Sequence, residues 1–360
     1  MAAARRPVRT GPPRGRRRIN LALQGGGAHG AFTWGVLDRL LEEPDLEIVG
    51  VSGASAGAMN ATVMAHGLAV GGHEGARAAL AAFWDRLAVM ARSSPLAFGP
   101  LERVTGRALG RLWLAGISQV ASPYDLNPAG YNPLRVVLED TIDFARLRRQ
   151  APVKLFVCAT NARTGQLKVF GPEAISLDAV LASACLPQLF HAIEIDGEHY
   201  WDGGYIANPP VLPLVTGTDC GDTLIVQIDP IRIEALPTSA RAIRERLQVL
   251  AFNAGFLREM HAIAALGRAL DRGGQGALAR LRRLAGRLGI GRRPVRLHLI
   301  EAEAALARLD ATSKLAVGDA AFLAELFTLG RGQAEGFLAR HKDAIGVRSS
   351  LDVAARFPGE

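Results

Sequence analysis

Ser55 stands at the centre of the pentapeptide Gly53-Ala54-Ser55-Ala56-Gly57, which matches the pattern Gly-x-Ser-x-Gly. A serine hydroxyl becomes an exposed nucleophile on a sharp strand-to-helix turn, and such a turn requires small flanking residues. Every flanking residue here is Gly or Ala, and a helix start behind Ser55 favours negative charge developing there. The pentapeptide therefore predicts a nucleophilic serine, whereas the simpler alternative makes Ser55 only a helix N-cap.

A second motif, Gly25-Gly26-Gly27-Ala28-His29-Gly30, matches the pattern Gly-x-Gly-x-x-Gly. This pattern also occurs in dinucleotide-binding folds, where an acidic residue follows at the end of the second strand. The second strand here ends at Gly50-Val51-Ser52, which disfavours a dinucleotide-binding oxidoreductase. The other interpretation is that backbone N–H groups of the glycines stabilise the oxyanion formed when Ser55 attacks an ester.

The third motif is Asp202-Gly203-Gly204, which follows Tyr200-Trp201. Serine is a weak nucleophile and needs a base within hydrogen-bonding reach. An aspartate held at a glycine-rich bend is suited to that task. Read alone, however, Asp-Gly is only a turn signal.

Hydrophobic patterning places the first two motifs on neighbouring elements. Residues 18–24 and 46–51 have the patterns of buried strands, and residues 30–43 and 56–68 have those of helices. Strand, helix, strand, helix in this order predicts a parallel sheet covered on both faces. The glycine motif and the Ser55 turn then follow adjacent strands.

The rest of the chain continues the same alternation. Residues 153–159, 167–170, 223–228 and 295–301 are expected to be strands, and residues 74–92, 176–185 and 239–271 helices. Gly71-Gly72 marks a break before one helix, and residues 95–135 are expected to form a long irregular excursion.

Together, the three motifs resemble those of the patatin-like phospholipase family. Gly25–Gly30 resembles the family's oxyanion motif, Gly53–Gly57 its Gly-x-Ser-x-Gly motif, and Asp202–Gly204 its Asp-Gly-Gly motif, in the family's order. The resemblance extends over about residues 18–215 and includes Ala182–Pro187. It implies an α/β three-layer sandwich with a mostly parallel central sheet.

The resemblance also implies a Ser-Asp dyad without histidine. Ser55 would be the acyl-accepting nucleophile and Asp202 the general base, with Gly25, Gly26, Gly27 and Gly30 forming the oxyanion motif and Gly53, Gly57, Gly203 and Gly204 completing the turns. The expected reaction is hydrolysis of a lipid carboxylic ester, with no metal and no organic cofactor. Family members often have Arg or Lys where this chain has His29, so His29 is either an anion or substrate contact or a third catalytic residue.

The net charge of +8 comes from two segments. Residues 1–18 carry seven arginines and residues 272–296 carry eight, and neither segment contains an acidic residue. Removing these 15 from 42 basic residues leaves 27 against 34 acidic ones, a net charge of −7. The segments lack aromatic residues, which argues against single-stranded nucleic acid as a partner. The simplest interpretation is solvated chain, and the alternative is attraction to an anionic membrane surface.

We expect three regions: a basic disordered tail at residues 1–17, a catalytic domain at 18–215, and a continuation at 216–360 that completes the sheet. Because no secretory signal and no long apolar run is found, a cytoplasmic protein is expected, with peripheral membrane contact left open. Two other functions remain: a catalytically degenerate lipid-binding protein, and the dinucleotide-binding oxidoreductase already disfavoured.

Overall fold

The structure is a computed structural model, and it describes residues 16–93, 121–272, 295–309 and 311–357. The expected tail therefore lies outside the described residues except for its last two positions. Most of the arginine-rich segment 272–296 also lies outside them. No described helix is both long and apolar enough to cross a membrane.

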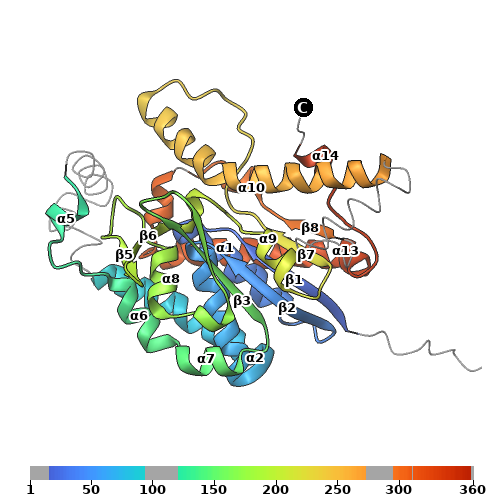
Figure 1. Cartoon of the computed structure of the whole chain (residues 1–360), viewed down its shortest axis with the longest axis horizontal. Coiled ribbons are helices and arrows are strands. Elements are labelled where there is room, and N and C mark those ends of the chain that lie inside the picture. The colour runs from blue at the N-terminus through green and yellow to red at the C-terminus, as the bar shows by residue number, and fades with distance from the viewer. Residues whose placement is uncertain (1–15, 94–120, 273–294, 310, 358–360) are drawn as a thin grey trace, which may run out of the picture.

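The centre of the molecule is an eight-stranded mixed sheet (Figure 1). Its strands are β1 (Arg17–Leu23), β2 (Leu46–Gly53), β3 (Lys154–Asn161), β4 (Leu167–Phe170), β5 (Ile193–Ile195), β6 (Glu198–Asp202), β7 (Asp222–Val226) and β8 (Arg296–Ile300). The order is β5-β6-β3-β2-β1-β7-β8, and β4 pairs with β3. β3, β2, β1, β7 and β8 run parallel, while β4, β5 and β6 form the antiparallel part.

Helices cover both faces of this sheet. The α-helices are α1 (Gly30–Leu40), α2 (Ala56–Ser93), α5 (Pro123–Leu126), α6 (Pro133–Thr141), α7 (Phe144–Gln150), α8 (Leu177–Ser183), α9 (Leu212–Gly217), α10 (Ala240–Arg272), α12 (Glu303–Leu306), α13 (Ala320–His341) and α14 (Val353–Arg356). Short 3-10 helices are η1 (Gly27–His29), η2 (Pro172–Ala174), η3 (Gly203–Tyr205), η4 (Ala311–Leu315) and η5 (Lys342–Ala344).

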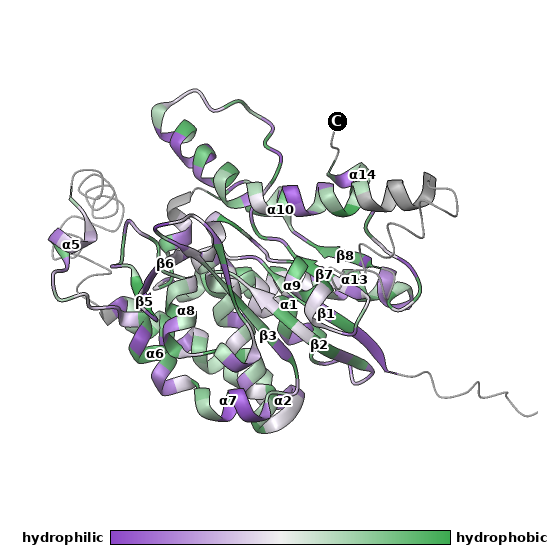
Figure 2. Ribbon diagram, viewed as in Figure 1, coloured by the Kyte–Doolittle hydropathy of each residue, from purple (hydrophilic) through white to green (hydrophobic). Residues whose placement is uncertain are grey.

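The alternation of side chains along the strands divides the core into two clusters. In β1, Ile19, Leu21 and Leu23 point into a large cluster shared with α1, α2 and α13, whereas Ala22 points to the opposite face. On that second face, α9, α10 and α14 pack against the sheet. Figure 2 shows the central strands largely in the colours of apolar residues. The three-layer α/β architecture expected from the sequence is confirmed.

Most of the expected elements are present, and the differences lie in the middle of the chain. The break expected at Gly71-Gly72 is present, because both residues have non-helical backbone angles and divide α2 into two helical parts. Part of the segment expected to be irregular is helical, in α5 and α6, while residues 94–120 lie outside the described residues. The sequence analysis missed β5, β6 and α13. Asp202 therefore ends a strand and stands directly before the glycine-rich turn η3.

The boundaries drawn for the basic segments were wrong at their inner ends. Arg17 begins β1, where its guanidinium lies 2.5 Å from Asp45, and Arg18 lies 2.7 Å from Asp219. Arg296 begins β8 and lies 2.6 Å from Asp222. Composition alone could not distinguish these arginines from their neighbours, because their acidic partners are distant in sequence.

Candidate active site

Ser55 lies in the tight turn between β2 and α2. Its backbone φ of 54° is in the left-handed region, which a residue other than glycine rarely adopts. A side chain at Gly53 would overlap the backbone of Gly57, and one at Gly57 would overlap the carbonyl of Leu23. The glycines therefore allow the strained turn that a nucleophile elbow requires. The Ser55 residue is only 9% exposed.

The end of α8 holds this turn in place. The Ser55 N–H lies 3.0 Å from the carbonyl oxygen of Ser183 and 3.1 Å from its Oγ. Two acceptors thus engage the amide of Ser55, which leaves the hydroxyl as the group available for chemistry. Ser183 belongs to the segment Ala182–Pro187, whose resemblance to the family gave no role to any single residue.

Asp202 is completely buried at the end of β6. Its Oδ1 accepts a hydrogen bond of 2.7 Å from the N–H of Gly204, and its own N–H donates to Cys185. Oδ2 meets no donor with normal hydrogen-bond geometry among the described residues. The Ser55 hydroxyl nevertheless lies close enough to affect the Asp202 carboxyl. The structure therefore brings together the two residues selected from the sequence.

The environment of Asp202 sets its protonation. Burial raises the pKa of its carboxyl to about 7, because a charged carboxylate is poorly solvated there. The Gly204 N–H, the Ser55 hydroxyl and the charge of Lys314 oppose this shift. A carboxyl with a pKa near neutrality can both accept and release a proton at physiological pH. Perturbation of this kind is typical of functional sites.

The glycine motif lies directly beside Ser55. A Cβ on Gly25 would lie 2.6 Å from the Cβ of Ser55, so only glycine allows this approach. The N–H of Gly25 is already bonded to Asn208 Oδ1 at 2.7 Å. The N–H of Gly30 bonds within the first turn of its helix, to the carbonyl of Gly27. Neither amide is therefore available to an oxyanion in this conformation.

Gly26 and Gly27 are different. Within the described residues, neither N–H is among the backbone donors that have a partner. Gly27 has a φ of 59°, and a side chain there would overlap the carbonyl of Lys314. Their amides remain the candidates for an oxyanion hole. Gly25 allows the close approach to Ser55, and Gly30 allows close packing on α2, since a Cβ on Gly30 would lie 2.8 Å from the Cβ of Ala56.

His29 is buried, and its Nε2 lies 2.7 Å from Ser313 Oγ. Its ring also makes an edge contact with Phe322 of α13. Both proposed roles of His29, in substrate contact and in catalysis, remain predictions, and its known partners belong to the C-terminal part of the chain.

Several residues that the sequence patterns did not single out hold the glycine motif, and Gln24 makes the most contacts. Gln24 Oε1 accepts from the N–H groups of Ile228 and Asp229 at 2.5 and 2.7 Å. Gln24 Nε2 donates to Asn253 Oδ1 and to the carbonyl of Asn208. The only signal in the sequence was a buried polar position directly before Gly25, since the partners lie about 200 residues away.

Lys314 and Asp229 form an ion pair beside the same motif. The Lys314 Nζ lies 2.5 Å from Oδ1 of the buried Asp229. The backbone carbonyl of Lys314 packs against Gly27, and the positive charge of the Lys314 side chain lowers the pKa of Asp202. Lys314 thus acts on both the geometry of the glycine motif and the electrostatics of the carboxylate.

A Ser-His-Asp cluster separate from the candidate site lies at the opposite end of β7. His298 Nδ1 lies 2.9 Å from Ser350 Oγ, and its Nε2 lies 3.1 Å from Asp222 Oδ1. His298 is completely buried, and Asp222 is also bonded to Arg296 and the N–H of Gly346. This cluster ties β7, β8 and the C-terminal segment together, which is a structural role.

A mixed α/β sheet with a serine elbow beside a buried carboxylate is an arrangement suited to an acyl hydrolase. The family model described as patatin-like phospholipase matches residues 21–215, more than half of the chain. The chain therefore belongs to the patatin-like phospholipase family, whose general activity is the hydrolysis of lipid acyl esters.

The chain was also compared with solved structures and with curated proteins. The crystal structure of VipD from Legionella pneumophila is similar over 91% of this chain and 67% of that chain, with 16% identity and a TM-score of 0.44. Similarity at this level carries no conclusion about activity. A comparison with curated proteins finds no match.

Proposed function

We propose that this protein hydrolyses carboxylic esters of lipids through an acyl-enzyme on Ser55, with Asp202 as its general base. The observation that carries the proposal is the approach of a strained, glycine-flanked serine to a buried carboxylate whose pKa is about 7. Family membership supports the general class of reaction.

In the first half-reaction, Ser55 Oγ attacks the ester carbonyl and its proton passes to Asp202. The amides of Gly26 and Gly27 donate to the tetrahedral oxyanion. One such donor typically contributes about 3 kcal/mol to transition-state stabilisation. When the intermediate collapses, the alkoxide leaves with the proton from Asp202, and Ser55 carries the acyl group.

In the second half-reaction, water attacks the acyl-enzyme carbonyl and gives its proton to Asp202. The same amides stabilise the second oxyanion. Collapse of this intermediate releases the fatty acid and returns the proton to Ser55 Oγ. Asp202 thus alternates between its two protonation states, which is the use of a pKa near 7.

The alternatives make different predictions. A dinucleotide-binding protein would need room for pyrophosphate at Gly25–Gly27, but a side chain on Gly25 would already contact Ser55, and Lys314 closes on Gly27. A catalytically degenerate lipid-binding protein would lack a reactive serine, whereas the strained turn at Ser55 favours retained chemistry.

A lipid-class screen with the full-length chain tests the proposal. Wild type should release fatty acid from one or more lipid classes and should cleave nitrophenyl acyl esters, and Ser55→Ala should reduce both rates at least a thousandfold. Ser350→Ala is the matched control, because Ser350 contacts His298 in a Ser-His-Asp cluster away from Ser55. If esterase activity is lost in Ser350→Ala and kept in Ser55→Ala, the assignment of the nucleophile is wrong.

A further inference from the structure

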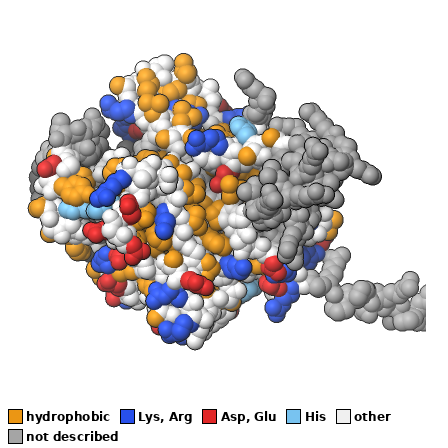
Figure 3. All heavy atoms as spheres, in the orientation of Figure 1, with side chains coloured by type: hydrophobic (Ala, Val, Ile, Leu, Met, Phe, Trp, Pro, Cys, Tyr) orange, Lys and Arg blue, Asp and Glu red, His pale blue; other side chains and the backbone are white. Residues whose placement is uncertain are grey.

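Five exposed apolar side chains, among them the most exposed one of the described residues, lie on the N-terminal half of α10 and the loop before it. Leu236 is 85% exposed and Leu247 59%, values more typical of charged residues. We call this surface the α10 face, and its members are Ile233, Leu236, Ile243, Leu247 and Leu250. Figure 3 shows apolar side chains gathered on this protruding end of the molecule, with basic side chains beside them.

The three helical members of the α10 face form one stripe along the helix. Ile243, Leu247 and Leu250 are separated by four and three residues, so they lie on one side of the helix. The buried residues Phe256 and Met260 belong to the other side, which packs on the sheet. The helix is therefore apolar on two sides, of which only one has a partner among the described residues. Contiguous exposed apolar surface of this kind marks an interaction site.

The charges around the stripe are mainly basic. Glu234 is the acidic side chain exposed beside it, because Glu245 pairs with Arg241 and Glu259 accepts from the N–H groups of Val211 and Leu212. Besides Arg241, which pairs with Glu245, the exposed basic residues of the same region are Arg232, Arg244 and Arg258. Apolar side chains framed by arginines match the surface of an anionic bilayer, which presents phosphate groups above acyl chains.

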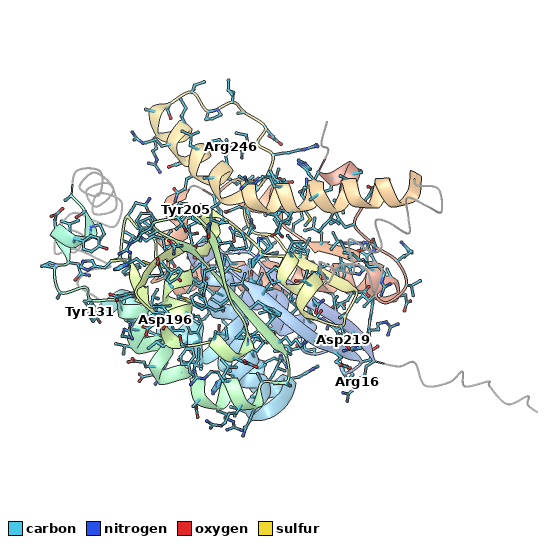
Figure 4. The ribbon with its side chains drawn as sticks, viewed as in Figure 1. Arg16, Tyr131, Asp196, Tyr205, Asp219 and Arg246 are labelled. Carbon is cyan, nitrogen blue, oxygen red and sulfur yellow. The ribbon has the colours of Figure 1, made fainter. Side chains whose placement is uncertain are left out.

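The same helix is attached to the candidate active site. The ring of Phe252 packs against Gly204 and lies 4.7 Å from the ring of Tyr205, and a side chain at Gly255 would overlap the carbonyl of Ile206. Asn253 accepts the hydrogen bond from Gln24 described above. Figure 4 shows Tyr205 beneath the part of α10 that carries Arg246. At 1.5 Å per residue, Ile243 lies roughly 14 Å along the helix from Phe252.

We propose that the α10 face docks the protein on anionic phospholipid bilayers and so brings the Asp202 turn to the lipid surface. The benefit of docking to catalysis rests on the proposed function, whereas the test below measures vesicle binding and needs no turnover. The apolar side chains enter the acyl-chain boundary while the arginines contact lipid phosphates. A bilayer bound there lies against the same helix whose Phe252 packs on Gly204, next to Asp202.

Vesicle co-sedimentation tests the docking without turnover. All proteins carry Ser55→Ala, and the vesicles contain either phosphatidylglycerol with phosphatidylcholine or phosphatidylcholine alone. Leu236→Ser, Leu247→Ser and Leu250→Ser combined should weaken binding to the anionic vesicles at least tenfold. The matched control combines Val70→Ser and Val347→Ser, two exposed apolar positions on other elements, and should bind like the parent protein. Circular dichroism melting verifies that each variant is folded.

A second set of variants tests the charge. Arg232→Gln, Arg244→Gln and Arg258→Gln together should abolish the preference for anionic over neutral vesicles. In a third test, a polarity-sensitive fluorophore on Leu247→Cys should shift to the blue with anionic vesicles, whereas the same label on Val347→Cys should not. Labelling is selective because the three native cysteines are buried.

Unchanged anionic-vesicle binding by the leucine variant overturns the proposal, as does equal binding of the parent protein to both vesicles. If light scattering shows that the leucine substitutions change the oligomeric mass while vesicle binding is unaltered, the face is a protein contact and the proposal is also overturned. Failure of the proposed function is read separately, from wild-type turnover of soluble esters.

Discussion

At the scale of single residues, the chemistry depends on the protonation of Asp202. Because only the ionised carboxylate accepts a proton from Ser55, kcat/KM for a soluble ester should rise with pH and level off above about 7. Lys314→Met removes a charge that lowers this pKa and leaves Asp229 unpaired, so the rising limb should move to higher pH. Lys168→Met, on exposed β4, is the control. A pH profile that does not move in Lys314→Met contradicts this electrostatic role.

Burial of the ionised Asp202 carboxylate lowers the free energy of unfolding of the protein. A carboxyl whose folded pKa is raised loses stability as pH rises from its unfolded value towards the folded one, here from 3.8 to about 7. Asp202→Asn should therefore stabilise the protein, by up to roughly 4 kcal/mol above pH 7 and by much less near pH 4. Urea unfolding at pH 4.5 and pH 8 measures this. An equal effect at both values would mean that Asp202 is not protonated at low pH in the folded state.

At the scale of elements, the turn after β1 and the turn after β2 must approach without side chains between them. Gly25→Ala places a methyl group 2.6 Å from Ser55 Cβ, and we expect at least a hundredfold loss of kcat with a smaller change in KM. Gly71→Ala is the matched control, since nothing lies within 4 Å of a side chain at Gly71. Comparable losses in both variants would show that the effect is on the fold, not on the approach to Ser55.

The cluster around Asp222 stabilises the contact between β7, β8 and the C-terminal segment. Burial alone would raise the pKa of Asp222, but hydrogen bonds from His298 and Arg296 lower it to about 2. Its contribution is present above pH 3.8 and is lost as the pH falls towards 2. Asp222→Asn should lower the free energy of unfolding at pH 7 by roughly 3 kcal/mol. Fluorophosphonate labelling of Ser55 in the folded variant should persist, and its loss would argue for a role in catalysis.

These elements also show what could be predicted from the sequence. Ser55 was found because small residues signal the sharp turn that carries it, whereas Asp202, alone only a turn signal, was selected through the resemblance to the family. Asn208, Lys314 and Asp229 were not, because their contacts with the glycine motif join segments that lie far apart in the chain. β6 was missed because it has only five residues and follows β5, a strand of three residues, so its pattern is not distinct from a loop.

At the scale of the whole molecule, the basic tail and the α10 face are separate segments that act through different residues. Deleting residues 1–15 removes four arginines but leaves Arg17 and Arg18 in β1. If the tail attracts the protein to anionic membranes, the deletion should weaken vesicle binding at 50 mM salt and have little effect near 500 mM, because salt screens charge. Turnover of soluble esters should not change. Vesicle binding that is unaltered at low salt would leave the tail as solvated chain.

The whole account depends on one chemical fact, namely that Ser55 becomes acylated. Intact-protein and peptide mass spectrometry after incubation with a fluorophosphonate, or after acid quenching during turnover of a nitrophenyl ester, measures this. We predict a single adduct on the peptide containing Ser55, absent in Ser55→Ala and slowed when Asp202 is replaced by Asn. An adduct on Ser350 or another residue, or turnover with Ser55 unmodified, would contradict the assignment of both catalytic residues.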